Sequence, residues 1–351
     1  MKRLTLLIAL LGGLALACRG GSATAISTPL SLPTTASNTE AAPTSMPWII
    51  PATRIPSTSI PPTREPTLAA PPTVELPPTA EISAQSQGLS PTVSDMTYCT
   101  LGGVDLKMDV YLPEDRSQLA PVVMYVHGGG WAAGDKRNGP SLAETAMLIQ
   151  NDFAVFSVNY RLAPEFLFPA MIQDVKCAVR SIRAHAADFN INPDRIGVWG
   201  ASAGGHLASL MGTADESAGF DVGQYLEYSS RVQAVVDMFG PTDLTAPMTT
   251  DQQVALLTNA FPSNLYAAGS PVTYVTPDDP PFLILHGDRD VLVPVEQAFI
   301  LYNRLNEQSV PAKLVIVQNA GHGFNPVGGT PDPDPAQIPQ MVLDFFNQYL
   351  R

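Results

Sequence analysis

The sequence predicts an α/β protein whose mostly parallel sheet carries helices on both faces. Short runs rich in valine and isoleucine alternate along residues 96–351 with longer segments of helical pattern. This alternation is typical of parallel strands joined by crossover helices. The runs are apolar throughout, as expected of strands covered on both faces. Polar, glycine-rich turns follow several runs, so functional residues are expected at the carboxyl ends of the strands.

Residues 1–17 have the pattern of an export signal that is removed from the mature protein. Lys2 and Arg3 precede an apolar stretch that is too short for a comfortable transmembrane span. Residues 15–17 fit ordinary signal cleavage, whereas Cys18 directly afterwards resembles the lipidated cysteine of bacterial lipoproteins. We therefore expect either a lipoprotein anchored to the membrane at Cys18, on the cell surface or in the periplasm, or a secreted protein.

Residues 18–95 contain the anchor site and a linker rich in proline, threonine and serine. Fourteen of the chain's 34 prolines lie in this stretch, where large apolar side chains are few. Such a segment buries too little apolar surface to offset the entropy lost on ordering it. We expect a disordered tether on the order of 100 Å or more in length, since proline-rich chains extend by roughly 3 Å per residue.

The folded domain, expected at residues 96–351, carries all of the net charge. Residues 1–95 hold five basic and five acidic side chains, so the formal charge of −13 belongs to the rest of the chain. A surface this acidic repels polyanions, which excludes nucleic acid as an expected partner. About 256 residues are enough for one domain with a sizeable core. The sequence does not determine the oligomeric state.

The expected strands and helices follow in chain order. Leu106, Met108 and Val110 alternate with other side chains, as in an antiparallel leading strand. Further strands are expected at 121–126, 154–158, 195–199, 232–238, 282–285 and 314–317, and the clearest helices at 171–188, 205–211, 295–306 and 338–350. Residues 241–270 are long enough for a small lid but not for a large cap domain, and an ordinary helical connection is an equal alternative.

Ser202 lies at the centre of Gly-Ala-Ser-Ala-Gly at 200–204, between an expected strand and an expected helix. A serine on so tight a turn has a strained backbone, and its hydroxyl projects into the open. The glycines two residues before and after it remove β-carbons that would collide as strand and helix close together. Amides at the helix start point toward negative charge beside the serine. Alone, the pentapeptide is weak evidence, because turns of small residues are common.

An acid and a histidine follow two later strands. His-Gly-Asp-Arg-Asp at 286–290 comes directly after one apolar run, and Asn-Ala-Gly-His-Gly-Phe at 319–324 comes after the next. A serine hydroxyl is a poor nucleophile at neutral pH, so His322 is expected to take the proton of Ser202. Asp290 is expected to orient the imidazole and to stabilise its charged form.

A glycine loop follows the strand expected at 121–126. His-Gly-Gly-Gly-Trp at 127–131 leaves backbone amides unobstructed. The amides of Gly128 or Gly129 are therefore expected to join that of Ala203 in stabilising an oxyanion beside the serine. A flexible glycine turn without such a role is the alternative.

Other acids and histidines compete with these assignments. Asp288 lies two residues from Asp290 and can reach the same space, and Asp243 is an outside candidate whose expected role is loop capping. The remaining histidines are expected to be solvated on a helix face (His185), to pack with a hydrogen bond (His206) or to brace their loops (His127 and His286). No cluster has metal-ligand spacing, so neither a metal nor a cofactor is predicted.

Cys99 and Cys177 remain once Cys18 is set aside. A disulfide between them is chemically allowed in an exported chain. It would tie the leading strand to the helix expected at 171–188. Two buried thiols are the equal alternative.

Taken together, the motifs resemble the α/β-hydrolase family, and within it the carboxylesterases of the hormone-sensitive-lipase and feruloyl-esterase-like (BD-FAE-like) kind. The resemblance covers nearly all of 97–351 and extends to Asn-Tyr-Arg-Leu-Ala-Pro at 159–164, Phe-Pro-Ala at 168–170 and Asp-Pro-Pro at 279–281. It implies a triad of Ser202, Asp290 and His322, and an oxyanion hole at Gly128, Gly129 and Ala203. Ala201 stands where hormone-sensitive-lipase relatives usually have an acidic residue, which favours the feruloyl-esterase-like branch.

The resemblance implies an extracytoplasmic serine carboxylesterase that acts through an acyl-enzyme on short-acyl or hydroxycinnamoyl esters, as small molecules or linked to polysaccharide. Residues 96–351 are then the catalytic domain, and Trp131, Phe324 and 241–270 shape its acyl pocket. Two alternatives stay open. A serine peptidase or amidase of the prolyl-oligopeptidase kind would have a propeller domain that the linker cannot supply. A surface binding protein on a hydrolase scaffold would typically lack a triad residue.

Overall fold

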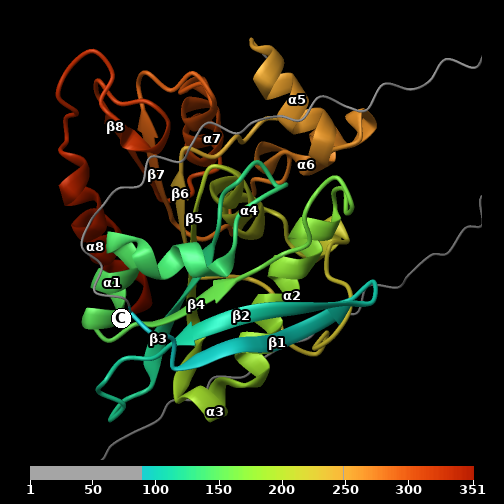
Figure 1. Ribbon diagram of the computed structural model, residues 1–351, viewed down its shortest axis with the longest axis vertical. Coiled ribbons are helices and arrows are strands. Elements are labelled where there is room, and N and C mark those ends of the chain that lie inside the picture. The colour runs from blue at the N-terminus through green and yellow to red at the C-terminus, as the bar shows by residue number, and fades with distance from the viewer. Residues whose placement is uncertain (1–88, 248) are drawn as a thin grey trace, which may run out of the picture. The chain divides into compact units, whose positions relative to one another are not determined.

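The computed structural model of the protein describes residues 89–247 and 249–351. The expected export signal, Cys18 and most of the linker lie outside the described residues. Within them, eight strands form one sheet in the order β1-β2-β4-β3-β5-β6-β7-β8 (Figure 1). The strands are β1 (Val93–Leu101), β2 (Val104–Tyr111), β3 (Ala120–Val126), β4 (Ala154–Val158), β5 (Ile191–Ala201), β6 (Ala234–Met238), β7 (Phe282–Gly287) and β8 (Ala312–Val317).

The sheet is mostly parallel, as the sequence predicts. β2 runs antiparallel to β1 and β4, and every pairing from β4 to β8 is parallel. β1 was not among the expected strands and begins inside the predicted linker. Two register shifts in its pairing with β2, after Val93 and after Thr97, break the alternation that identifies a half-buried strand from sequence.

Helices cover both faces of the sheet. They are α1 (Ala143–Gln150), α2 (Ala170–Ala184), α3 (Ala186–Phe189), α4 (Ala203–Thr213), α5 (Asp251–Ala260), α6 (Tyr266–Gly269), α7 (Glu296–Glu307) and α8 (Ile338–Leu350). Val122 and Met124 of β3 belong to one apolar core with α2, α4 and α7, whereas Val123 and Tyr125 belong to a second core with α1 and α8. Successive side chains of a strand point to opposite faces, so the two cores lie on opposite sides of the sheet. No helix among the described residues is long and apolar enough to cross a membrane.

Two helical expectations differ from the structure. The single helix expected at 171–188 breaks at His185, whose backbone leaves the helical region. Its Nδ1 atom lies 2.8 Å from the Ser181 carbonyl oxygen, and its ring contacts Tyr225 edge-on. His185 therefore terminates α2 and is half-buried, and the prediction of a solvated residue on a helix face is wrong. α1 was missed because only Thr145 and Leu148 of its eight residues are buried, which leaves little apolar periodicity.

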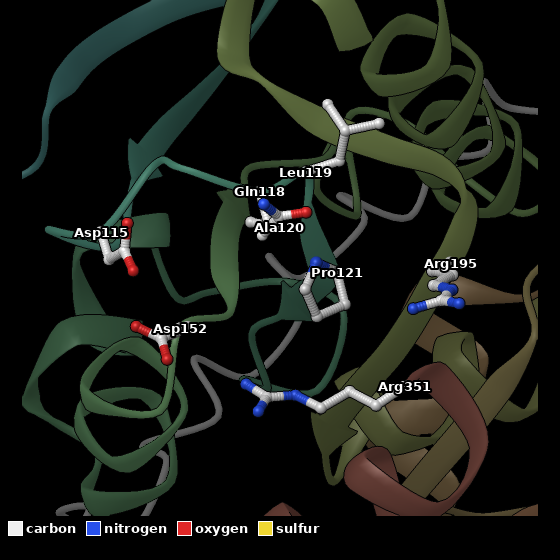
Figure 2. Close-up of a pocket in the computed structure, with 8 residues that line it drawn as sticks. All are labelled: Asp115, Gln118, Leu119, Ala120, Pro121, Asp152, Arg195 and Arg351. Atoms are coloured by element: carbon white, nitrogen blue, oxygen red, sulfur yellow. The ribbon is translucent and has the colours of Figure 1, made fainter. Parts of the chain in front are cut away.

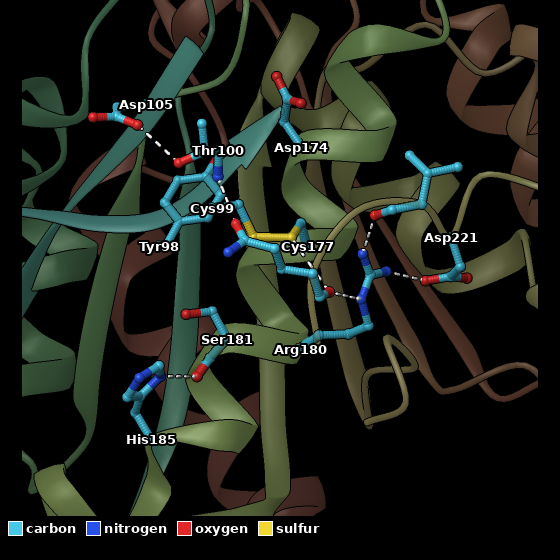
Figure 3. Close-up of a disulfide and its surroundings, with 12 residues drawn as sticks. Tyr98, Cys99, Thr100, Asp105, Asp174, Cys177, Arg180, Ser181, His185 and Asp221 are labelled. Carbon is cyan, nitrogen blue, oxygen red and sulfur yellow. Dashed lines mark hydrogen bonds and ion pairs between the residues drawn. A yellow bond between two sulfur atoms is a disulfide. The ribbon is translucent and has the colours of Figure 1, made fainter. Parts of the chain in front are cut away.

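A disulfide ties the first strand to α2. Cys99 of β1 and Cys177 of α2 are bonded across 78 residues of sequence, and both are buried (Figure 3). Arg180, one turn further along α2, pairs with Asp221 and donates a 3.1 Å hydrogen bond to the Gln224 carbonyl. The covalent bond and these polar contacts hold the β1–β2 hairpin and the loop after α4 against the same helix.

Candidate active site

Ser202 occupies the sharp turn between β5 and α4. Its backbone has φ 56° and ψ −122°, an uncommon conformation for a residue with a side chain. The turn is fixed by a 2.8 Å hydrogen bond from the Ser202 amide to the Met238 carbonyl on β6. A β-carbon on Gly200 would lie 2.4 Å from backbone atoms of Gly204, and one on Gly204 would lie 2.1 Å from the Val126 carbonyl oxygen. Only glycine lets strand, turn and helix approach this closely.

The side chain of His322 lies within hydrogen-bond distance of both Ser202 and Asp290. The Ser202 Oγ atom is 3.1 Å from His322 Nε2, and His322 Nδ1 is 2.8 Å from Asp290 Oδ2. They follow β5, β8 and β7 respectively, so three carboxyl ends of the parallel sheet supply the site. An ionised carboxylate only accepts hydrogen bonds, so Nδ1 carries the proton and Nε2 is free to accept one from the serine hydroxyl.

The Asp290 carboxylate is buried, and both of its oxygens accept hydrogen bonds. Its Oδ1 atom accepts 2.9 Å hydrogen bonds from the amides of Leu292 and Val293. Burial favours the neutral acid, but hydrogen bonds from His286, His322 and the Val293 amide outweigh it and hold the pKa of Asp290 below its ordinary value. Asp290 is therefore an anion at neutral pH.

The competing acids lie elsewhere. Asp288 pairs with the Arg289 side chain and accepts a hydrogen bond from the Ala320 amide. Asp243 caps its own loop through the amide and hydroxyl of Thr245, the role expected for it.

Aromatic rings hold the loop that carries His322. The Phe239 ring packs edge-on against the imidazole, with 4.7 Å between centroids, and Phe324 packs against Phe239 at 5.0 Å. The Asn325 side chain donates a 2.9 Å hydrogen bond to the His322 carbonyl. Phe324 is only 8% exposed, so it supports the histidine loop more than it lines an open pocket.

The glycine loop after β3 lies against the elbow. A β-carbon on Gly128 would be 2.8 Å from the Ala201 carbonyl oxygen and 3.5 Å from the Ser202 β-carbon. Gly129 folds back on its own loop, where its carbonyl accepts hydrogen bonds from the amides of Ala132 and Ala133. Ala203 is the first residue of α4, and the first amides of a helix lack intrahelical acceptors. The glycine loop and the start of α4 thus both lie next to Ser202.

His127 braces this loop as predicted. Its Nδ1 atom lies 2.8 Å from the Gly128 carbonyl, and its ring stacks on Tyr160, with 4.3 Å between centroids. The Tyr160 hydroxyl returns a 3.0 Å hydrogen bond to the His127 carbonyl. Burial lowers the pKa of His127, which keeps it neutral.

Trp131 and His206 form a buried pair beneath the loop. Trp131 Nε1 donates a 3.2 Å hydrogen bond to His206 Nδ1, and His206 Nε2 lies 2.7 Å from the Gly269 carbonyl. The Phe261 ring packs edge-on against both. The prediction of His206 as a hydrogen-bonded packing residue is confirmed. Trp131 is 5% exposed, so its indole is packed against His206 and Phe261 and offers little accessible surface.

Helix α5 bridges the two loops beside Ser202. The side chain of Leu256 reaches Gly130, where an added β-carbon would lie 2.7 Å from Leu256 Cδ2. Gln253 donates a 3.2 Å hydrogen bond to the Val291 carbonyl, one residue after Asp290. Phe261, directly after α5, is buried in the core. Between β6 and β7 the described residues form α5, α6 and short 3₁₀ turns, so this connection is helical, and α5 lies against loops from both sides of the serine.

A pocket of about 260 Å³ lies away from Ser202, His322 and Asp290 (Figure 2). It is lined by Asp115, Gln118, Leu119, Ala120, Pro121, Asp152, Arg195 and Arg351. Ala120 begins β3 and Arg195 lies in the first half of β5. These are the amino ends of parallel strands, whereas Ser202 follows the carboxyl end of β5. The pocket therefore belongs to the opposite edge of the sheet.

Two further buried polar residues were not assigned a part in the site by sequence reasoning. His286, considered only as a loop brace, lies 3.5 Å from Asp290 Oδ2. Asp237 is buried in β6, where it accepts hydrogen bonds from the Ser209 hydroxyl and the Gly240 amide. A lone carboxylate in the run Val-Val-Asp-Met was the signal that could have identified it. No group of three or more His, Cys, Asp or Glu that could hold a metal ion occurs within 89–247 and 249–351.

Comparison with known proteins finds a matching family model and similar esterases. The BD-FAE family model matches residues 108–305, more than half of the chain. LipM of Mycobacterium tuberculosis, named a probable carboxylic ester hydrolase, is 35% identical over 219 residues, which cover 59% of this chain and 50% of LipM. The chain thus spans about half the length of this curated relative.

Two solved structures are similar over nearly three quarters of the chain or more. A truncated carbohydrate esterase from gut microbiota has a TM-score of 0.64 and 30% identity, and the match covers 76% of this chain and 98% of that one. A bifunctional GH43-CE protein of Bacteroides eggerthii has a TM-score of 0.63 and 31% identity, and the match covers 73% of this chain and 38% of that one.

Proposed function

The chain belongs to the BD-FAE family of α/β-hydrolases, and from that premise we propose that it is a serine carboxylesterase with Ser202, His322 and Asp290 as its catalytic triad. One observation carries the proposal: at the carboxyl edge of the sheet, the His322 imidazole is 3.1 Å from the Ser202 hydroxyl and 2.8 Å from the Asp290 carboxylate, so that the three groups form a continuous hydrogen-bonded series. The names of the similar proteins, which include a carboxylic ester hydrolase and a carbohydrate esterase, support the same reaction.

The proposed reaction proceeds in two halves. His322 Nε2 removes the proton of the Ser202 hydroxyl as Oγ attacks the ester carbonyl carbon, and the tetrahedral oxyanion binds to the amides of Ala203 and of Gly128 or Gly129. The imidazolium, stabilised by Asp290, then protonates the departing alcohol and leaves an acyl-serine. Water attacks the acyl-serine with His322 again as base. The products are a carboxylic acid, an alcohol and the original enzyme.

We assign short-acyl or hydroxycinnamoyl esters as the substrate class, including esters that decorate polysaccharide. The floor of the site is compact, because Trp131 and Phe324 are packed into the core and α5 rests on the glycine loop. Such a site suits small acyl groups better than long lipid chains. The carbohydrate esterase among the similar structures supports a sugar alcohol as the other half of the ester.

Export to an oxidising compartment is part of the proposal. The buried disulfide between Cys99 and Cys177 supports it, since such bonds persist outside the cytosol. The proposed anchor is a lipid on Cys18, which lies outside the described residues. Fractionation of cells that produce the full chain or its Cys18→Ala variant tests this point. Loss of the protein from the membrane fraction in the variant supports an anchor, and unchanged soluble protein in both cases contradicts it.

A panel of esters tests the reaction and its substrate class together. We expect the full chain to hydrolyse p-nitrophenyl acetate and butyrate faster than the octanoate, to release ferulate from methyl ferulate or acetate from acetylated xylan, and to leave an aminoacyl p-nitroanilide intact. Ser202→Ala should lower kcat by about 10⁴-fold or more, because triad residues act as a unit.

Three outcomes would contradict the proposal at different points. An unchanged rate in Ser202→Ala would remove the mechanism. Faster cleavage of the anilide than of any ester would indicate a peptidase. A protein that neither hydrolyses esters nor reacts with a fluorophosphonate probe would be a binding protein on this scaffold.

A further inference from the structure

A second histidine lies directly behind the triad acid. His286, near the end of β7, is completely buried, and its Nε2 atom lies 2.8 Å from the Val293 carbonyl oxygen and 3.5 Å from Asp290 Oδ2. Carbonyl and carboxylate oxygens only accept, so Nε2 carries a proton, which it donates to the Val293 carbonyl with the Asp290 carboxylate beside it. The same Asp290 oxygen accepts the hydrogen bond of His322 Nδ1. One carboxylate oxygen is thus shared between the two imidazoles.

Two hydrogen bonds link His286 to Val293 and Val293 to Asp290, and so connect the two ends of the loop that carries the acid. The Nε2 proton of His286 reaches the Val293 carbonyl, while the Val293 amide donates a 2.9 Å hydrogen bond to Asp290 Oδ1. Residues 287–293 therefore form a loop that is fixed at its start by β7 and at its end by the hydrogen bond from His286. Rotation of the Asp290 carboxylate away from His322 would break contacts at both of its oxygens.

The other side of His286 faces the interior. Asp237 of β6 is in register with Ile284 of β7, and side chains two apart on a strand share a face. His286 and Asp237 therefore project from the same face of the sheet, which α4 covers through the hydrogen bond from Ser209 to Asp237. His286 Nδ1 is buried and has no hydrogen-bond partner among the described residues. Burial raises the pKa of Asp237. Asp237 thus shares a face of the sheet with His286, and Asp290 Oδ2 lies 3.5 Å from the Nε2 atom of the same ring.

We propose that His286 is a positioning residue that holds the Asp290 carboxylate in the orientation that His322 requires. The inference rests on the proposed esterase function, because it assigns His286 a part in that same triad. His286 does not reach the substrate. It acts through Asp290, as outer hydrogen-bond partners orient the ligands of other catalytic sites.

Two substitutions at position 286 separate positioning from packing. In the full chain, His286→Leu fills much of the space but donates no hydrogen bond. His286→Gln keeps an N–H group at about the distance of Nε2. With p-nitrophenyl acetate, we expect His286→Leu to lower kcat roughly tenfold with KM unchanged, since lost outer partners typically cost about 10- to 100-fold. His286→Gln should recover most of that loss. His185→Gln, in a histidine remote from the triad, is the matched control and should keep the wild-type rate.

A double-mutant cycle with Asp290→Asn decides whether the effect passes through the acid. If His286 acts through Asp290, His286→Leu should cost less than about twofold in the Asp290→Asn background, although it costs roughly tenfold alone. The inference would be overturned if His286→Leu lowered kcat by the same factor in the wild-type and Asp290→Asn backgrounds. It would also be overturned if the Leu and Gln variants lost equal kcat and this loss paralleled a fall in their melting temperatures. A wild-type kcat in His286→Leu would overturn it as well. A wild-type protein without ester hydrolysis would instead overturn the proposed function, and this inference with it.

Discussion

At the scale of single residues, the partners of a histidine decide its role. His322 shares hydrogen bonds with a serine and an ionised carboxylate, whereas His206 is enclosed by the Trp131 indole and the Gly269 carbonyl. The two histidines share the same chemistry and differ in burial and partners. Burial lowers the pKa of His206 to about 4, because the hydrogen bond to the Gly269 carbonyl offsets only part of the desolvation of an imidazolium.

This low pKa predicts acid-sensitive folding. The imidazole of the unfolded chain has an ordinary pKa of about 6.5, so below that pH the unfolded state binds a proton that the folded state does not. The contribution of His206 to stability is present above pH ~6.5 and is lost as pH falls toward about 4. Between pH 7 and pH 4.5 the free energy of unfolding should fall by about 2–3 kcal/mol from this residue, at ~1.4 kcal/mol per pKa unit.

Urea unfolding at the two pH values checks this. His206→Gln keeps a neutral polar side chain, so its stability should depend less on pH over this range, whatever its stability at pH 7. His185→Gln should retain the wild-type dependence. An identical pH dependence in His206→Gln and the wild type would contradict the assignment.

At the scale of secondary-structure elements, α5 connects loops that the chemistry requires to be close together. A capping box at Thr250 and Gln253 fixes its start, and Phe261 anchors its end in the core. Between these points Leu256 lies on Gly130 of the glycine loop, while Val254 of the same helix is 45% exposed. α5 thus places one apolar side chain beside the proposed oxyanion hole and leaves another in solvent.

We expect Leu256→Ala to enlarge the space beside the glycine loop. The ratio of kcat/KM for p-nitrophenyl butyrate over acetate should rise about tenfold, since one or two methylenes in an apolar pocket are worth about 1–3 kcal/mol. Val254→Ala is the matched control on the same helix and should leave the ratio unchanged. Equal losses for both esters in Leu256→Ala would show that the side chain only supports the loop.

At the scale of the whole molecule, the disulfide acts far from the triad. It joins the edge hairpin to α2 across 78 residues, while the three catalytic candidates follow β5, β7 and β8. A cross-link over a loop of this length removes entropy mainly from the unfolded chain. Its loss should therefore affect stability and leave the site geometry intact.

The Cys99→Ala/Cys177→Ala variant should unfold with about 2–5 kcal/mol less free energy than the wild type. Its kcat on p-nitrophenyl acetate at 25 °C should stay within about twofold of the wild-type value. Wild-type protein unfolded and refolded in a reducing agent should match the variant in stability, which separates the loss of the bond from the loss of side-chain volume. An unchanged melting temperature in the variant would contradict a stabilising role.

The local sequence determined the class of fold and the residue types of the site. Short apolar runs predicted six of the eight strands because buried parallel strands need apolar side chains on both faces. The leading strand followed from alternation, and the elbow at Ser202 followed from glycines whose β-carbons would collide. The order of serine, acid and histidine, each after one of the predicted strands, came from the same patterns, because the carboxyl ends of parallel strands meet at one edge.

The tertiary structure decided what depends on contacts between distant segments. It separated Asp290 from Asp288, since a two-residue spacing does not show which carboxylate faces an imidazole 32 residues away. It also paired Cys99 with Cys177, ended α2 at His185 and placed His286 behind the acid. Periodicity identifies residues that are buried, but hydrogen-bond partners far apart in the chain are known only when the packing of the strands brings them together.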